Sequence, residues 1–461
     1  MNITSTLFLF LFLPTVLLLF FIFRGRRMRT LLLLAASLFF YAWGDPRGIV
    51  ILLLVILLNL LLVRLRDSRC GERGRYRLLI LGVTSDVALL LYYKYLAFLF
   101  SFLPTGWASG LPAAPALMPL GISFYVFKVV SFQIDSYRKP ALAQGGILDF
   151  ALYVSFFPQV LSGPITRYEA MRTQIDSLRP TREQFDRGAE RFALGFIKKI
   201  LIAERLAALA NNAYALISPG LPLAWIGALA YMMQLYFDFS GYSDMAIGLG
   251  LFFGIETPEN FRYPYAADSV QDFWRRWHIS LSTWFRDYVY FPLGGSRCSV
   301  ARTCLNTAIV FGLTGLWHGA NLTFVVWGVY HAIFLILERT VLKRALPKTP
   351  KLLRRVYVLL AALCGWVFFR ADSLSLAWTY LGALFGASSG GWTQVVQQVT
   401  AEQLTALVLA CVFAFPVWAE IRTRLLERSQ RAYYGVVFLL FLIAVCYLVG
   451  NGFSPFLYIQ F

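Results

Sequence analysis

The residues best suited to chemistry stand in one short stretch, Gly315-Leu316-Trp317-His318-Gly319-Ala320-Asn321. His318 lies there in a long apolar run, where a titratable group is costly unless it is paired or faces a water-filled cavity. A histidine ordinarily titrates at about 6.5, so it can accept and return a proton near neutral pH. The flanking glycines let a substrate approach closely. We therefore predict that His318 is the general base of an acyl transfer within a membrane.

Transfer of an acyl group to a hydroxyl also needs a donor that stabilises the developing oxyanion. Asn321, a backbone N–H or His278 could supply it, and the residues alone do not rank these candidates. The third histidine, His331, follows Trp327 by four residues on an apolar run. This setting is more typical of a packed, hydrogen-bonded core residue than of a catalyst.

Other catalytic classes lack their motifs. The three histidines and six cysteines are scattered, without HExxH or CxxC spacing, so we predict no metal. No GxSxG elbow, phosphate-binding loop or dinucleotide fingerprint is present, so we also predict no tightly bound cofactor. One positioned base plus oxyanion stabilisation is enough for the predicted chemistry.

Two further stretches concentrate polar residues in apolar surroundings. Tyr236–Asp244 places Asp238 and Asp244 around one glycine, where carboxylates usually pair with a base or a helix terminus; the alternative is a structural helix break. We expect the span from Leu221 to end near Phe239. In the other stretch, a stripe at helical spacing is typical of one helix seated at the cytoplasmic membrane interface. The stripe consists of Trp274, Trp277, Leu281 and Trp284.

His278 lies in this second stretch and is either a satisfied interfacial histidine or a functional one. We predict that a set of residues near the histidines and carboxylates lines the substrate path or supports it. These residues are Trp317, Asn321, Asp238, Ser240, Asp244, Trp274, Arg275 and Arg276.

The elements that hold these residues must be membrane-spanning helices. Of 461 residues, 59% are hydrophobic and 14% charged, against about 25% charged in soluble domains. At about 20 residues per crossing, the sequence predicts an all-α polytopic protein with roughly eleven crossings. The net charge of +18 comes from basic loops such as 24–29 and 64–77, which indicates cytoplasmic loops and an extracytoplasmic N-terminus rather than nucleic acid binding.

The prolines and glycine of Phe156–Ile165 predict either a broken or re-entrant helix or a simple kink. The basic stretch 167–191 would fall outside if that segment crossed fully, so charge favours re-entrance. We expect one membrane domain, 1–461, with N-terminal helices in 1–118, a motif-bearing core in 119–340, and C-terminal helices and a tail in 341–461.

Six motifs follow one another along the chain: PLGISFYVFK (119–128), FFPQVLSGPI (156–165), YFDFSGYSDMAIG (236–248), DFWRRWHISLSTWFRDYVYFPLGG (272–295), GLWHGAN (315–321) and GWVFFRADS (365–373). Together they resemble the membrane-bound O-acyltransferase family, and within it the bacterial branch that O-acetylates alginate and peptidoglycan. The resemblance implies a ring of helices around a central funnel or tunnel, with His318 catalytic and His278 lining the tunnel from the cytoplasmic side.

The resemblance also implies the reaction partners. The donor is acetyl-CoA or a carrier thioester in the cytoplasm, and the acyl group leaves on the outer face of the bacterial cytoplasmic membrane. A separate extracytoplasmic esterase-like protein then completes O-acetylation of a polysaccharide acceptor.

The last six residues, FLYIQF, resemble the C-terminal signature of this branch and of a small companion peptide in teichoic acid D-alanylation. By that resemblance Tyr458 could accept the acetyl group as a relay. The alternative is an aromatic anchor at the outer interface.

Two rival functions remain open. One is a D-alanyl transferase acting on teichoic acid. The other is a transporter or flippase in which Asp238, Asp244 and Lys128 serve a permeation path. The sequence lacks paired interrupted helices in corresponding halves, which argues against the transporter.

Overall fold

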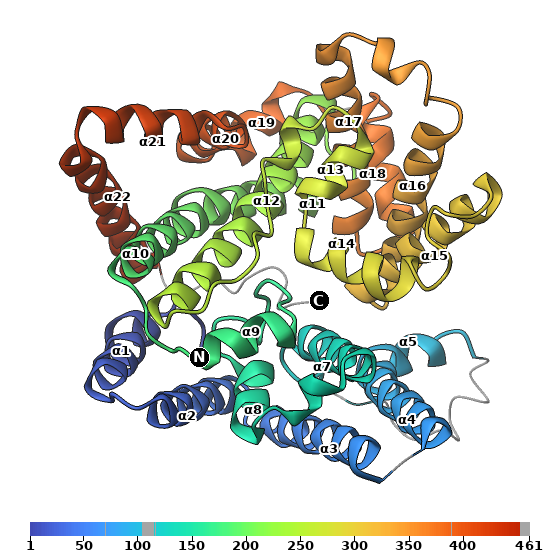
Figure 1. Ribbon diagram of the computed structural model, residues 1–461. Helices are drawn as coiled ribbons and strands as arrows, with labels where there is room; N and C mark the ends of the chain where they lie inside the picture. Colours follow the sequence, from blue (N-terminus) through green and yellow to red (C-terminus); the bar gives the residue numbers. More distant parts are fainter. Residues whose placement is uncertain (70, 104–114, 116, 389, 452–461) are drawn as a thin grey trace. The chain divides into compact units, whose positions relative to one another are not determined.

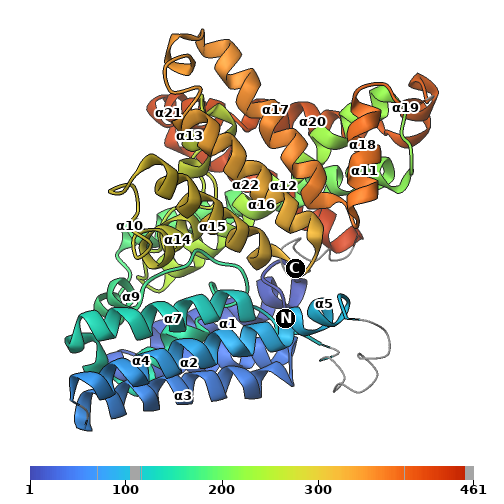
Figure 2. The same cartoon turned by 90° about the vertical axis from the view of Figure 1, so that its right-hand side faces the viewer.

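A computed structural model describes residues 1–69, 71–103, 115, 117–388 and 390–451. Every regular element in this described part is a helix, which confirms the all-α class (Figures 1 and 2). The described residues form two compact units, 1–192 with 243–258 and 193–242 with 259–451. Helices α10 (Arg182–Ile197) and α12 (Leu221–Phe252) contribute residues to both. The single-domain division stays a prediction.

The first unit contains, besides part of α10 and α12, the elements η1 (Phe8–Phe12), α1 (Leu13–Ile22), α2 (Arg26–Gly44), α3 (Gly48–Arg69), α4 (Glu72–Leu90), η2 (Leu91–Tyr95), α5 (Leu96–Phe100), α7 (Ile122–Arg138), η3 (Pro140–Gln144), α8 (Ile147–Ser155) and α9 (Tyr168–Ile175).

The second unit contains, besides the rest of those two helices, η4 (Lys198–Ala203), α11 (Glu204–Ala215), η5 (Pro264–Ala266), α13 (Val270–Arg276), α14 (Ile279–Phe285), η6 (Arg286–Tyr290), α15 (Val300–His318), α16 (Leu322–Arg339), η7 (Leu346–Lys348), α17 (Lys351–Arg370), α18 (Leu374–Leu384), α19 (Trp392–Gln398), α20 (Ala401–Phe413), α21 (Val417–Arg428) and α22 (Gln430–Asn451).

Several helices are long and apolar enough to cross a membrane, so this is a multi-pass membrane protein. In the described residues there are five, at Gly48–Arg66, Glu72–Phe100, Leu322–Arg339, Lys351–Arg370 and Gln430–Gly450. A sixth follows if α19 and α20, bent by 101°, form one broken span. The expected count of about eleven is not confirmed, because other apolar helices, such as Phe8–Ile22 and Leu374–Leu384, are shorter than a full crossing.

The segment predicted as a broken helix is irregular and buried. Helix α8 ends at Ser155, and residues 156–166 continue without helix while every side chain stays buried. Lys128 Nζ donates hydrogen bonds to the Tyr153 carbonyl at 2.6 Å and to Gln159 Oε1 at 3.1 Å. A buried non-helical backbone needs such partners. The broken-helix prediction is therefore confirmed over the simple kink, and re-entrance relative to the bilayer stays a prediction.

The helix end expected near Phe239 is wrong, because α12 continues through the polar stretch to Phe252. Gly241 allows this continuous helix to pack closely: a Cβ there would stand 2.8 Å from the Gly195 carbonyl oxygen. The two carboxylates pair with bases, as one alternative predicted. Asp238 Oδ1 lies 2.6 Å from Lys199 Nζ, with both side chains buried. Asp244 and Arg191 form the second pair, also at 2.6 Å.

The single helix expected around the tryptophan stripe is also wrong. The chain forms two short helices, α13 and α14, because His278 between them adopts a left-handed conformation with φ of 44°. The Oγ of Ser269 caps α13 by accepting from the backbone N–H of Asp272. The side chains of the stripe pack within the unit, since Trp274, Trp277, Leu281 and Trp284 are all buried. Placement of these helices at the cytoplasmic membrane interface stays a prediction.

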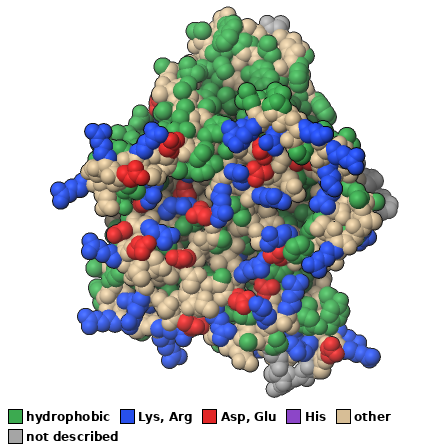
Figure 3. All heavy atoms as spheres, turned by 45° about the horizontal axis from the view of Figure 1, so that its top comes forward, with side chains coloured by type: hydrophobic (Ala, Val, Ile, Leu, Met, Phe, Trp, Pro, Cys, Tyr) green, Lys and Arg blue, Asp and Glu red, His purple; other side chains and the backbone are tan. Residues whose placement is uncertain are grey.

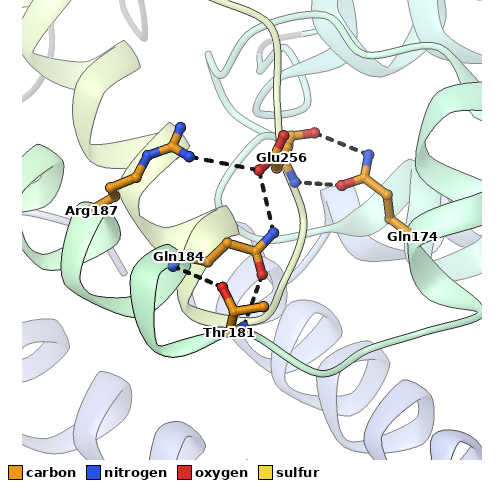
Figure 4. A network of polar contacts seen from close by, with 5 residues as sticks. All are labelled: Gln174, Thr181, Gln184, Arg187 and Glu256. Atoms are coloured by element: carbon orange, nitrogen blue, oxygen red, sulfur yellow. Dashed lines mark hydrogen bonds and ion pairs between the residues drawn. The ribbon is translucent and has the colours of Figure 1, made fainter.

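A polar network in the first unit holds the chain just beyond α12 (Figure 4). The side chain of Gln174 accepts from the backbone N–H of Glu256 at 2.5 Å and donates to its carbonyl at 3.2 Å. Gln184 donates to the Glu256 carboxylate and closes a capping box with Thr181 at the start of α10. Arg187 lies 4.0 Å from the same carboxylate. The network joins α9, α10 and the chain after α12.

Basic side chains at the helix ends serve different purposes. Figure 3 shows Lys and Arg interspersed with Asp and Glu over the face that it draws. Exposed Arg26 pairs with Asp149 at 3.0 Å. Arg29, by contrast, is buried although it belongs to the same predicted loop. A basic cluster in the sequence therefore includes residues that hold the fold as well as residues that indicate topology.

Candidate active site

The motif GLWHGAN (315–321) forms the end of α15 and the turn to α16. Helix α15 ends at His318, Gly319 is extended, and Asn321 begins α16. Asn321 Oδ1 accepts from the backbone N–H of Thr323 at 3.1 Å, and Nδ2 donates to the Asp372 carbonyl at 2.9 Å. The Asn321 amide thus caps α16 and ties the turn to the chain between α17 and α18.

Close packing of the two helices sets where His318 lies. A Cβ on Gly315 would stand only 2.3 Å from the Phe324 carbonyl oxygen of α16. Gly312, one turn earlier on α15, would meet nothing within 4 Å. Gly328 of α16 faces α15 in the same way, since a Cβ there would stand 2.3 Å from the Phe311 carbonyl oxygen. Gly315 and Gly328 therefore allow this approach of α15 to α16, and His318 follows Gly315 by three residues.

Aromatic rings surround the His318 imidazole, which is 3% exposed. Its ring centroid lies 4.9 Å from Trp327, 5.0 Å from Phe369 and 4.9 Å from Trp317, in edge-to-face arrangements. Such contacts fix the plane of the ring through packing. The funnel or tunnel that would reach this ring stays a prediction.

A hydrogen bond holds His278 in place. Its Nδ1 lies 3.1 Å from Asn260 Oδ1, and both residues are fully buried. The same oxygen accepts from the backbone N–H of Ser280 at 3.1 Å and from its hydroxyl at 2.9 Å. The Asn260 carbonyl accepts from the Ile279 N–H at 3.0 Å. Burial lowers the pKa of His278 to about 3, so the imidazole is neutral at pH 7.

The three histidines of the chain belong to one aromatic cluster. Trp317 contacts both His278, at 6.0 Å, and His318. Trp327 contacts both His318 and His331, the latter at 5.2 Å. His331 is buried, as predicted for a core residue, but neither ring nitrogen has a hydrogen-bond partner among the described residues. Its place beside Trp327 follows from their four-residue spacing on α16, whereas the contact of Trp327 with His318 was not apparent from the sequence, because it depends on how α15 packs against α16.

The other predicted residues divide into two groups. Trp317 and Trp274 belong to the cluster, since Trp274 lies 5.0 Å from His331. The remainder do not join it through these ring contacts. Ser240 is buried on α12, Asp238 and Asp244 are held by their bases, Arg275 is exposed, and Arg276 pairs with Asp272 at 2.9 Å. Tyr458 lies outside the described residues.

The sequence analysis did not identify two residues that contact the histidines, Phe369 beside His318 and Asn260 beside His278. Phe369 stands inside the motif GWVFFRADS but carried no chemical signal of its own. Asn260 precedes Phe261 in a loop rich in proline and tyrosine, where a single asparagine is unremarkable. In the part of the chain that the structure describes, no three side chains of His, Cys, Asp or Glu come together as metal ligands would.

Two buried imidazoles, those of His278 and His318, contact the same Trp317 ring, and a positioned imidazole can serve as the proton acceptor in acyl transfer to a hydroxyl. Comparison with known proteins also indicates acyl transfer. Residues 91–376 match the model of the family described as MBOAT, membrane-bound O-acyltransferase family.

The chain is similar along its length to several bacterial proteins. It is 40% identical to the probable alginate O-acetylase AlgI of Azotobacter vinelandii, over 99% of each chain. It is 35% identical to the peptidoglycan O-acetyltransferase of Helicobacter pylori, over 83% of this chain and 79% of that one. A more distant relative, the teichoic acid D-alanyltransferase of Bacillus subtilis, is 34% identical over 47% of this chain and 58% of its own.

Proposed function

Because the chain belongs to the membrane-bound O-acyltransferase family, we propose that it moves an acetyl group across the bacterial cytoplasmic membrane for O-acetylation of an extracytoplasmic polysaccharide. The observation that carries the proposal is the 40% identity to a probable alginate O-acetylase along essentially the whole chain. Alginate, peptidoglycan or another exopolysaccharide is the acceptor class. Similarity to the teichoic acid enzyme extends over about half of the chain, which favours acetyl over D-alanyl transfer.

His318 is the general base in this proposal. Its ring stands at the end of α15, fixed by Trp317, Trp327 and Phe369. The oxygen of an incoming hydroxyl attacks the acyl carbon of a thioester, the carbon–sulfur bond breaks, and the hydroxyl proton passes to the imidazole and then to the departing sulfur. The donor is acetyl-CoA or a carrier thioester, bound as a substrate and released.

The topology and partners follow from the same proposal. The N-terminus lies outside, since basic residues at 24–29 follow the first apolar segment. The acetyl group leaves on the outer face, where an esterase-like partner completes transfer to the polysaccharide. Tyr458 is the proposed relay. Changing Tyr458 to Phe keeps the ring and removes the nucleophile, so unimpaired transfer in that variant would retire the relay.

The test is mass spectrometry of envelope polysaccharides from cells with the gene, without it, and complemented with His318→Ala. Loss of O-acetyl on deletion, not restored by His318→Ala at equal membrane abundance, supports the proposal. Loss of D-alanine esters instead would assign the rival transferase. Restoration of O-acetyl by His318→Ala would remove the base and favour a flippase, which needs no imidazole.

A further inference from the structure

The hydrogen bonds around Asn260 determine which nitrogen of His278 carries the proton. The backbone N–H of Ser280 can only donate, so the Asn260 side-chain atom that it meets must be the carbonyl oxygen. The same oxygen faces His278 Nδ1 at 3.1 Å. An oxygen that only accepts requires a donor, so Nδ1 carries the hydrogen. In a neutral imidazole the other nitrogen, Nε2, then carries the lone pair.

The backbone N–H of Ser280 also fixes which way the Asn260 amide is turned. Turning the Asn260 amide over would place its NH₂ against the Ser280 N–H, and two donors would face each other in a fully buried place. The Ser280 hydroxyl, 2.9 Å from the same oxygen, adds a third donor to it. The backbone of Asn260 is fixed as well, through its carbonyl and the Ile279 N–H.

We propose that Asn260 is a positioning residue that holds His278 in the tautomer with its lone pair at Nε2, so that His278 receives protons and does not donate to the oxyanion. This rests on the proposed acyl transfer, in which the hydroxyl oxygen bonds to the acyl carbon, the carbon–sulfur bond breaks, and His318 takes the hydroxyl proton and returns it to the departing sulfur. His278 is then a second site in the same cluster that can accept a proton, at Nε2. The oxyanion donor is then another group.

The surroundings of His278 favour a neutral ring. Phe239 of α12 and Trp317 of α15 pack against it at 4.7 and 6.0 Å. Among the titratable groups near these contacts and on the flanking helix, Asp238 pairs with Lys199 and Asp272 pairs with Arg276, while His318 lies on the far side of Trp317. Burial is the cause of the lowered pKa of His278, with no neighbouring charge contributing.

The direct test is nitrogen NMR of the full-length protein in lipid nanodiscs, with ¹⁵N-labelled histidine. The chain has only three histidines, and a His278→Asn variant identifies the signals of this one. We expect a protonated Nδ1 and an unprotonated Nε2 at neutral pH in the wild type. A hydrogen on Nε2 would overturn the proposal, and this readout needs no acyl transfer, so it stands apart from failure of the proposed function.

Two substitutions at Asn260 separate positioning from support of the fold. Asn260→Ala removes the acceptor, so we expect acyl transfer to fall at least about tenfold in kcat with little change in KM. Asn260→Asp keeps an acceptor for Nδ1 and adds a negative charge, which raises the pKa of the imidazole. Its activity should therefore recover as pH rises, with the pH–rate midpoint moved upward from that of the wild type.

Asn306→Ala is the matched control. Asn306 is also fully buried in this unit, and its amide donates to the carbonyls of Leu293 and Gly295 at 3.1 Å without touching a histidine. The Asn306→Ala variant should lower the unfolding temperature as Asn260→Ala does. It should leave the ¹⁵N signals of His278 and the midpoint of the pH–rate profile unchanged. If Asn260→Ala and Asn260→Asp lost acyl-transfer activity equally at every pH, and no more than Asn306→Ala does, Asn260 would be a structural residue only.

Discussion

Buried basic side chains in the first unit differ in kind from the buried histidines in the second. Arg29 donates to the carbonyls of Phe20, Phe23 and Leu178, at 3.2, 2.7 and 2.6 Å. Lys128 likewise donates to the Tyr153 carbonyl at the end of α8. These side chains donate hydrogen bonds to backbone oxygens where helices end or break, and that role occupies their polar nitrogens.

The histidines are held in another way. The His318 imidazole is enclosed by the rings of Trp317, Trp327 and Phe369, and His278 has a single side-chain amide oxygen on its Nδ1. Ring packing restrains the orientation of an imidazole. The difference teaches that burial alone does not mark a functional group: a side chain that donates to several carbonyls serves the fold, whereas a neutral imidazole has a nitrogen that can accept a proton.

The largest expected effect separates the two regions by activity. His318→Gln keeps a polar side chain of similar size but removes the base, so acyl transfer should fall by about 10²- to 10⁴-fold. The free energy of unfolding of the purified protein should change by no more than about 1 kcal/mol. A large loss of stability with activity per folded molecule intact would place His318 with the structural cations and break the comparison.

The converse is expected for Lys128→Met. The substitution leaves the Tyr153 carbonyl and the Gln159 amide oxygen without this donor in a buried place, at a cost of about 1–3 kcal/mol in unfolding free energy. Activity per folded molecule should be retained. The control is Lys139→Met, just after α7, the helix that carries Lys128. Lys139 forms an exposed ion pair with Glu169, so its replacement should change the unfolding free energy by no more than about 0.5 kcal/mol.

Two glycines of α15 sharpen the account of how His318 is placed. Gly315→Ala would push a methyl against the Phe324 carbonyl and should cost about 1–3 kcal/mol, with a drop in acyl transfer because His318 moves. Gly312→Ala meets nothing within 4 Å and should be neutral or stabilise by up to about 1 kcal/mol. The measurements are the unfolding free energy and the acyl-transfer rate of both variants. If Gly315→Ala and Gly312→Ala gave the same values, close packing at Gly315 would not position the site.

The smallest effect is expected in the surface network of Figure 4. Glu256→Gln removes the charge opposite Arg187, and about half of each side chain is exposed. Exposed pairs contribute about 0.2–1 kcal/mol, and salt screens them. The loss should therefore shrink further in high salt. A loss above 2 kcal/mol in unfolding experiments would show that this network supports the fold as strongly as Lys128 does.

Much of the architecture was readable from residue types. Apolar runs predicted helices and a multi-pass protein, and six motifs predicted the family. The prolines at 158 and 164 predicted the broken segment after α8. Two predictions failed for one physical reason. Polar residues after Phe239 suggested a helix end, and the tryptophan stripe suggested one continuous helix, but partners distant in the sequence decided both outcomes.

By itself, the order of residues determined the class of the protein and most of the helix-forming segments, and it singled out His318 as the predicted base, because hydrophobicity, helix breakers and the scarcity of histidine are local properties. Only the tertiary structure decided that Asn260 holds His278, that Lys199 neutralises Asp238, and that Trp327 stands between His318 and His331. These are contacts between segments far apart in the chain, and their strength depends on distance and burial, which no local pattern encodes.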